Sequence, residues 1–556
     1  MQIIVLWILI VGALLRIDIM TSLNILTNAD SFAYLQMSHY FVNFSSEGFW
    51  TWWFWFLYSF CISLLDFFLG NGFFAAQIIN ILLFVTSGIL LFYIAERYLH
   101  IYYNYILLTI FILSSPLLYY QVNILSENLY IPLFLGLVLT LISYFEKEEL
   151  YKLAIAWWLV WLMYITRAEW FIYIAPILFI VTVIHIMRRK ELWEFLGGTI
   201  LLFFGFFILA FPYMVHLHTI TGEWWLTNKW SSNIRQAMMR WVEEMDDAGF
   251  ERAVGELTDD KKSLKSWFVW GLKYEKSTGE YSLKTLIMDD PQKFFNTWKQ
   301  NVGKLVVEIL PKMIIGDFIK TYQDPNFKFK KYTVIYYLLF IPLFFTFYGF
   351  ALMYIDKRRF IIFVFVPLFL TASAFFTLFF VLERYFIPFL PLLLVFMVYG
   401  MQWLWRKLTS LQVLRALFFA MMTLCISLLW IHYFINNMSI EKYTVKKVAG
   451  ERISEHMDTE FPGRTSLRIM ERFPIVTYYS GNWERWIVPY ANQADIITYA
   501  KYNNIDLLVV DSLDFARYRP TLSFLLDEKS ILKNSAFEPI YVSQKFWEKV
   551  ILYKIK

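Results

Sequence analysis

The chain contains about eleven apolar runs, most of them close to the roughly 20 residues that a helix needs to cross a bilayer. Runs of this length predict helices, because a lipid-exposed backbone must satisfy its polar groups internally. Apolar residues fill 59% of 556 positions and charged residues 17%, far from the balance of a water-soluble domain. We therefore expect a polytopic α-helical membrane protein. The expected spans are Ile3–Leu23, Phe73–Ala95, Tyr105–Tyr120, Leu129–Phe145, Leu153–Ile165, Phe171–Met187, Phe195–His216, Tyr332–Tyr354, Phe360–Leu382, Phe386–Trp405 and Leu414–Ile435.

Two apolar runs need separate interpretation. Trp50–Leu69 is crowded with Trp and Phe and is broken by Asp66, so we expect an interfacial helix that lies on the membrane. The N-terminal run Ile3–Leu15 has neither a basic segment before it nor a small-x-small cleavage site after it. We therefore expect a retained first span and not a cleaved signal peptide.

The basic residues of short loops predict the orientation, since cytoplasmic loops are enriched in Lys and Arg. The most basic short loops are Arg188–Lys190, Lys357–Arg359 and Arg406–Lys407. One assignment places all three in the cytoplasm, together with the N-terminus. The chain is then a multi-pass protein of the plasma membrane whose C-terminal region faces the outside.

Composition divides the chain into four parts. Residues 1–217 form an N-terminal transmembrane module whose outer loop and interfacial helix occupy 24–72, and 218–331 form a long outer loop. Residues 332–436 hold the last spans, and 441–556 form a small soluble domain. In that domain we expect a helix at Gln493–Tyr502 and an α/β fold. The expected strands are Ser466–Met470, Ile475–Tyr479, Ile505–Val510 and Val550–Ile555.

Several function classes are excluded or disfavoured by composition and motifs. The net charge of +5 is small for this length and forms no basic stripe, so we expect no nucleic-acid partner. The 2 cysteines, Cys61 and Cys425, lie in separate apolar runs and are expected to be small buried hydrophobes. The sequence has no Walker A loop, no GxSxG, no HExxH and no Cys/His cluster.

Two carboxylates stand where predicted spans meet the outer face. Asp30 follows the first span, and Glu127 opens an apolar helix after the third. Ionisable groups at a membrane edge are costly and are therefore candidates for function. Each segment also looks like a helix start, so an N-cap for Asp30 and a first-turn acid for Glu127 are the structural alternatives. The two kinds of role are compatible.

Arginines gather on the same face in this orientation. Arg167 and Glu169 lie between two spans, and Arg384 precedes the span that begins at Phe386. Arg16 lies near the outer end of the first span. Guanidinium groups suit phosphate binding, whereas a plain turn at Arg167 and snorkelling side chains at Arg384 and Arg16 are the alternatives. Together, carboxylates could activate a hydroxyl or hold a metal, while arginines hold a phosphate.

Nine short segments extend this pattern over nearly the whole chain. They are Leu15-Arg16, Asp30–Tyr34, Trp50–Leu69, Ser126–Phe134, Thr166–Glu169, Thr221–Lys229, Glu383–Pro391, Tyr478–Gly481 and Ile505–Asp511. In this order they resemble motifs of the GT-C superfamily of polyprenyl-phosphate-sugar-dependent glycosyltransferases. The similarity is strongest to the bacterial branch related to protein O-mannosyltransferases and the lipid A aminoarabinose transferase.

The resemblance implies a GT-C-like fold and a role for each matching residue. Asp30 would be the catalytic base and Glu127 a second acid of the site. The lipid phosphate of the donor would be bound by Arg384, with Lys229 and Arg16. The cavity would be lined by Tyr34, Arg167, Glu169 and Tyr385.

The implied reaction moves a sugar from a polyprenyl-phosphate donor, on the outer face of the membrane, to a hydroxyl of an envelope acceptor, with inversion at the anomeric carbon. The acceptor is a glycolipid, a polysaccharide or a protein. The first loop reads Asn-Ala-Asp30 and not the Asp-Glu pair of mannosyltransferases, and this departure counts against the protein acceptor. A divalent metal also stays open, because its use varies across the superfamily. The rival hypotheses are a transporter or lipid flippase, although no internal repeat is visible, and a non-catalytic envelope-assembly protein.

Overall fold

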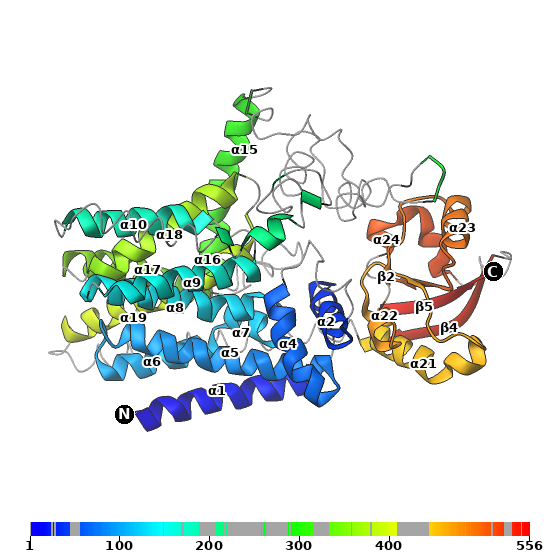
Figure 1. Ribbon diagram of the computed structural model, residues 1–556, viewed down its shortest axis with the longest axis horizontal. Coiled ribbons are helices and arrows are strands. Elements are labelled where there is room, and N and C mark those ends of the chain that lie inside the picture. The colour runs from blue at the N-terminus through cyan, green and yellow to red at the C-terminus, as the bar shows by residue number, and fades with distance from the viewer. Residues whose placement is uncertain are drawn as a thin grey trace.

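The computed structural model shows a bundle of long helices with a mixed α/β domain beyond one end (Figure 1). It describes residues 2–23, 26, 29–44, 56–147, 149–167, 172–187, 207–208, 210–215, 218–219, 224, 257, 259–262, 287–288, 291–315, 333–356, 359–378, 381–407, 444–483, 485–512, 515–527, 536–545 and 548–556.

The first half of the bundle consists of nine described helices. They are α1 (Gln2–Leu23), α2 (Ala29–Val42), α4 (Phe56–Leu69), α5 (Gly72–Ala95), α6 (Ile101–Leu113), α7 (Ser115–Val122), α8 (Glu127–Glu146), α9 (Leu150–Thr166) and α10 (Ile174–Met187). The second half adds α15 (Pro291–Lys304), the π-helical turn η4 (Leu305–Ile309), α16 (Leu310–Ile315), α17 (Thr333–Ile355), α18 (Arg359–Thr377), the 3₁₀ turns η7 (Glu383–Tyr385) and η8 (Ile387–Phe389), and α19 (Leu390–Lys407).

The apolar runs fold into helices where the structure describes them. Within the described residues, five helices are long and apolar enough to cross a membrane, and a bent pair makes a sixth. The expected spans in α9, α10 and α17 are shorter apolar helices, and most of 195–216 and all of 414–435 lie outside the described residues. The polytopic helical class is confirmed, while the count of eleven stays a prediction.

The bent pair is α6 and α7, which meet at an angle of 55°. Pro116 lies in the first turn of α7, where its missing N–H costs nothing, but it prevents α6 from continuing straight through. Because α8 begins shortly after α7 ends, the bend helps to set where Glu127 enters the bundle.

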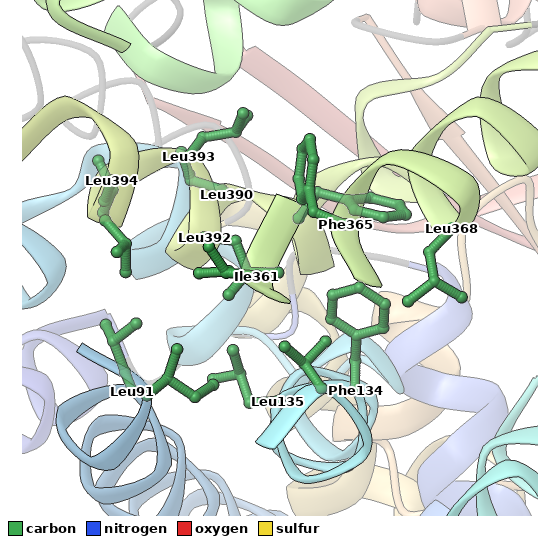
Figure 2. Packing of buried hydrophobic residues seen from close by; sticks show 14 of the residues in the cluster. Leu91, Phe134, Leu135, Ile361, Phe365, Leu368, Leu390, Leu392, Leu393 and Leu394 are labelled. Carbon is green, nitrogen blue, oxygen red and sulfur yellow. The ribbon is translucent and has the colours of Figure 1, made fainter. Parts of the chain in front are cut away.

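A cluster of aromatic and aliphatic side chains joins the two halves of the bundle. Figure 2 shows Phe134 and Leu135 of α8 facing Phe365 and Leu368 of α18 across this core. The ring of Phe389 in η8 lies 4.9 Å from that of Phe134 and 5.9 Å from that of Phe365. The start of α8 and the η7–η8 segment are therefore held against each other by packing.

Helix α4 packs one face against α2 and α5 and leaves the other open. Its buried residues include Tyr58 and Ile62, whereas Leu64, Phe67 and Phe68 are exposed. An apolar face that no described residue covers suits contact with lipid. The interfacial position of this segment stays a prediction, and residues 50–55 lie outside the described residues.

The C-terminal domain is built on a five-stranded mixed sheet with strand order β2-β1-β3-β5-β4. β1 pairs in parallel with β2 and β3, and β5 pairs antiparallel with β3 and β4. Its elements are α21 (Thr444–Glu460), β1 (Ile469–Met470), α22 (Ile475–Tyr479), β2 (Arg485–Trp486), α23 (Gln493–Tyr502), β3 (Leu507–Asp511), α24 (Phe515–Tyr518), η11 (Pro520–Leu526), β4 (Phe537–Lys545) and β5 (Glu548–Ile555).

One predicted strand of this domain is wrong, because residues Ile475–Tyr479 form the helix α22. The β-branched residues of this stretch suggested a strand. The buried carboxylate of Glu471 instead accepts hydrogen bonds from the backbone N–H groups of Val476 and Thr477, which satisfies the first turn of a helix. The predicted helix Gln493–Tyr502 matches α23, and the other three expected strands overlap β1, β3 and β5.

The C-terminal domain contacts the bundle through helix α2. The indole of Trp483 stacks on His39 at 4.4 Å and on Phe32 at 6.2 Å. The backbone N–H of Leu26 donates to the hydroxyl of Tyr479 at 3.0 Å, and the amide of Gln36 donates to the carbonyl of Trp483. The domain therefore covers the outer side of α2 (Figure 1).

Two glycines allow α17 and α19 to approach closely, which makes a sharp test of this packing. A Cβ at Gly349 would collide with the carbonyl of Phe396, and one at Gly400 would lie 2.6 Å from the carbonyl of Phe345. We expect Gly349→Ala to lower the free energy of unfolding by at least about 1 kcal/mol, because the backbone atoms of α19 cannot move aside to make room for the new methyl group. Gly303→Ala in α15 meets nothing within 4 Å and is the matched control. The measurement is thermal unfolding of the purified protein. Equal melting temperatures for the two variants would contradict this close packing.

The contact between the C-terminal domain and α2 generates a second prediction. Trp483→Ala should raise amide hydrogen exchange in α2 about five- to thirtyfold, because an aromatic contact of about 1–2 kcal/mol is lost. Trp486→Ala is the control, since Trp486 packs inside the domain near Tyr499. It should leave the exchange of α2 unchanged. Equal rates of amide hydrogen exchange in α2 for the two variants would show that Trp483 does not stabilise the contact between the C-terminal domain and α2.

Candidate active site

Four charged side chains from four separate segments form one alternating chain at the end of the bundle that faces the C-terminal domain. Nη1 of Arg384 lies 2.8 Å from Oδ2 of Asp30, and Nε of Arg384 lies 2.7 Å from Oε1 of Glu127. The same Oε1 accepts a hydrogen bond from Nη1 of Arg167. The order is therefore acid, base, acid, base, and we call these four residues the charge chain.

The charge chain has an outer half and an inner half. The side chains of Asp30 and Arg384 are each 28% exposed, whereas that of Glu127 is fully buried and that of Arg167 is 4% exposed. Unpaired charges in the interior of a membrane protein are costly, so alternation is what allows all four to be present. The outer half is the part that is open to solvent.

Helix α2 presents Asp30 from its first turn. The helix begins at Ala29, so Asp30 is not its N-cap, and its carboxylate reaches across to Arg384. A carboxylate in the first turn is favoured by the partial positive charge of the helix N-terminus. The capping alternative is therefore not what the structure shows for Asp30.

Helix α8 begins at Glu127, with Ser126 as its N-cap residue but without a side-chain capping bond. Glu127 is thus the first-turn acid of the helix and also a member of the charge chain. Its Oε1 is shared by two guanidinium groups, while Oε2 is buried and has no partner among the described residues. The first-turn position expected for Glu127 is confirmed, and its role as an acid of the site stays a prediction.

The two arginines come from short irregular segments. Arg167 ends α9 in extended backbone, and its guanidinium lies 5.5 Å from the ring centre of Tyr385. Arg384 lies in η7, after an extended Leu382 and before α19. Burial acts to lower the pKa of Arg384, but the carboxylates of Glu127 and Asp30 outweigh it and raise that pKa above its ordinary value. Arg384 is therefore a permanent cation.

Tyr34 and Tyr385 lie beside the charge chain, and their role in lining a cavity stays a prediction. Tyr34 is buried, and its ring packs edge-on against Tyr58 at 5.2 Å. Burial and then the charge of Glu127 raise the pKa of Tyr34, so its phenol stays protonated. Tyr385 stacks on Phe376 at 4.2 Å, which fixes the ring that faces Arg167.

The structure adds two polar groups that the sequence analysis did not single out. Lys312 of α16 forms an ion pair of 2.6 Å with Glu383, the neighbour of Arg384. Tyr58 donates to the side chain of Asn80, which in turn donates to the carbonyl of Asn123. Lys312 could have been noticed from the sequence, because it is a lysine inside the apolar run Leu305–Ile315. The contacts of Tyr58, Asn80 and Asn123 could not, because these positions are far apart in the sequence.

Arg16 is fully buried, and its described contacts include residues of α1, α5 and α7. Its guanidinium donates to Gln121 at 2.9 Å and to the carbonyl of Gly12 at 3.0 Å, and it stacks over Phe84 at 3.6 Å. These contacts tie α1 to α5 and α7. Donor-phosphate binding by Arg16 stays a prediction, and the predicted site residues Glu169 and Lys229 lie outside the described residues.

The side chains of the site also bear on the binding of a divalent metal ion. Over the part of the chain that the structure describes, no three His, Cys, Asp or Glu residues are placed to hold a metal ion. Hard divalent cations take about six or more oxygen donors. Here both site carboxylates are bonded to Arg384, so the guanidinium occupies the position between them. The described donor set does not fit a divalent cation.

Comparison with solved structures places the fold. The oligosaccharyltransferase of Archaeoglobus fulgidus in complex with Zn and sulfate superposes with a TM-score of 0.52 at 10% identity, over 91% of this chain and 68% of that one. Its apo form gives 0.51 at 11% identity, over 92% and 70%. Across most of its length, the chain is therefore structurally similar to GT-C enzymes, as the sequence motifs indicated.

A second solved structure superposes with a lower TM-score. ArnT from Cupriavidus metallidurans bound to undecaprenyl phosphate gives a TM-score of 0.41 at 8% identity, over 99% of this chain and 97% of that one. A TM-score at this level does not by itself indicate a shared fold. No protein-family model matches the sequence, and no curated protein is significantly similar to it.

The buried half of the charge chain generates a stability prediction. Arg167→Met should cost about 3 kcal/mol, because it leaves a buried carboxylate with one cation fewer. Arg97→Met is the matched control, since Arg97 pairs with Glu146 where their side chains are 27% and 40% exposed. That pair should contribute at most about 1 kcal/mol. Equal losses of thermal stability in the two variants would contradict the inner pair's structural role.

Proposed function

We propose that this chain is a membrane glycosyltransferase that moves a sugar from a polyprenyl-phosphate donor to a hydroxyl of an envelope acceptor. The observation that carries the proposal is the exposed half of the charge chain. A carboxylate able to take a proton and a guanidinium able to bind a phosphate lie 2.8 Å apart at the end of a bundle of apolar helices. The GT-C fold supports this assignment.

Asp30 acts as the general base. Its carboxylate is partly exposed, so an acceptor hydroxyl can approach it, and it takes the hydroxyl proton as the oxygen attacks the anomeric carbon. A positioned base contributes about a hundred- to ten-thousandfold to the rate. The attack occurs on the side opposite the leaving group, which inverts the configuration at that carbon.

Arg384 binds the phosphate that leaves. A planar guanidinium is well suited to phosphate oxygens, and negative charge that develops on the leaving group is stabilised by a fixed cation. Arg167, through Glu127, holds this cation in place from the buried side. Tyr34 and Tyr385 shape the cavity, together with Glu169, and Lys229 adds a second phosphate contact.

The outer face is the proposed side of the reaction. Helix α19 starts next to η7 and the charge chain, and it ends with the basic residues Arg406 and Lys407 at its other end. Basic residues favour the cytoplasm, so the charge chain faces outward, with the C-terminal domain over it and the N-terminus inside. A donor sugar already carried across the membrane on its lipid requires no nucleotide-binding motif.

Asp30→Asn provides the direct test of this function. Transfer of sugar from a polyprenyl-phosphate sugar to envelope acceptors should fall at least about a hundredfold, because the base is lost while the shape of the side chain is kept. Asp66→Asn in the adjacent helix α4 is the control and should transfer normally. The measurement is mass spectrometry of envelope glycans and lipids from cells that carry each variant.

Two results would contradict the proposal. Wild-type turnover by the Asp30→Asn protein would remove Asp30 from the chemistry. Movement of the lipid-linked sugar into vesicles without any covalent product would indicate a transporter or flippase instead.

A further inference from the structure

The charge chain contains as many carboxylates as guanidiniums, so these four described residues carry no surplus positive charge for a phosphate. Asp30 and Glu127 balance Arg384 and Arg167. Beside Arg384 in sequence, Glu383 forms an ion pair with Lys312, which adds one further charge of each sign. A phosphate that binds among these described residues must therefore compete with a carboxylate for its cation.

The geometry shows which carboxylate is the competitor. Glu127 is buried and is held by both arginines, so it cannot leave the chain. Asp30 lies at the open end and is bonded to Nη1 of Arg384. Nη2 of Arg384 has no partner among the described residues, and this side chain is 28% exposed. A phosphate can therefore approach Nη2 on the same guanidinium that already binds Asp30 through Nη1.

We propose that Arg384 is shared between the base and the leaving group, so that protonation of Asp30 transfers the guanidinium to the lipid phosphate. This inference rests on the proposed function and adds a coupling to it. The base and the leaving group do not act through separate cations. They exchange one cation during a single reaction step.

The charges balance through that step. The acceptor oxygen forms a bond to the anomeric carbon, and the bond from that carbon to the phosphate oxygen breaks, with its electron pair going to the phosphate. The acceptor proton passes to Asp30. Asp30 thus loses one negative charge as the phosphate gains one, and Arg384 contacts both. The cation does not have to move far, because its Nε stays bonded to Glu127.

The reverse exchange then releases the product. Once Asp30 gives its proton to water, its carboxylate again attracts Arg384 and weakens the hold on the polyprenyl phosphate. The ionised aspartate is therefore an internal competitor of the product. A variant with a neutral residue at position 30 should therefore bind the polyprenyl phosphate more tightly than the wild type, although this variant cannot catalyse the reaction.

Binding of undecaprenyl phosphate to the purified full-length protein tests this coupling without any turnover. We expect Asp30→Asn to bind it up to about fivefold more tightly than the wild type, the effect of removing one partly exposed carboxylate from an ion pair. Asp30→Ser should show the same gain in affinity, and it provides a second test in case Asp30→Asn does not fold. In an Arg384→Gln background the gain from Asp30→Asn should vanish.

The controls separate this inference from the proposed function. Asp66→Asn removes a carboxylate outside the charge chain and should leave the affinity unchanged, and the matching polyprenyl alcohol should not distinguish the variants. If the wild type binds undecaprenyl phosphate but Asp30→Asn binds it equally or more weakly, the shared guanidinium is overturned and the proposed function stands. If none of the variants binds it, the proposed function fails, and the inference fails with it.

Discussion

The ion pairs around Arg384 and Glu127 are the interaction on which the rest of the site depends. Any one of these four charges, left alone at this depth, would cost several kcal/mol, so each requires its neighbours. They come from the first turn of α2, the start of α8, the end of α9 and the 3₁₀ turn η7. The ion pairs therefore fix the relative positions of four segments that are distant in sequence.

The apolar bundle supplies the rigidity that such an arrangement needs. The contact of Phe389 with Phe134 and Phe365 holds η8 against α8 and α18, and so holds Arg384 near Glu127. The close approach of α17 and α19 at Gly349 and Gly400 strengthens the same half of the bundle. The C-terminal domain contacts α2, the helix that carries Asp30, through Trp483. Packing on both sides thus limits the movement of Asp30 and Arg384.

The sequence predicted the class of the protein and the members of the charge chain, but not their pairing. Hydropathy identified the helices, because a bilayer imposes a length and a polarity that a single sequence displays. The cost of burying charge singled out Asp30, Glu127, Arg167 and Arg384. Which carboxylate meets which arginine depends on packing between segments as far apart as α2 and η7, and no local pattern encodes that. For the same reason, the helical state of Ile475–Tyr479, which depends on Glu471, was missed.

We propose that the phosphate of a lipid-linked donor binds at the open end of the charge chain, and this binding can be tested directly. A cryo-electron-microscopy structure of the full-length protein with bound undecaprenyl phosphate would locate that phosphate. We predict phosphate oxygens within hydrogen-bonding distance of Nη2 of Arg384, with Asp30 beside them and Glu127 still bonded to Nε. A phosphate bound elsewhere, with the pair of Asp30 and Arg384 intact and inaccessible, would contradict the account.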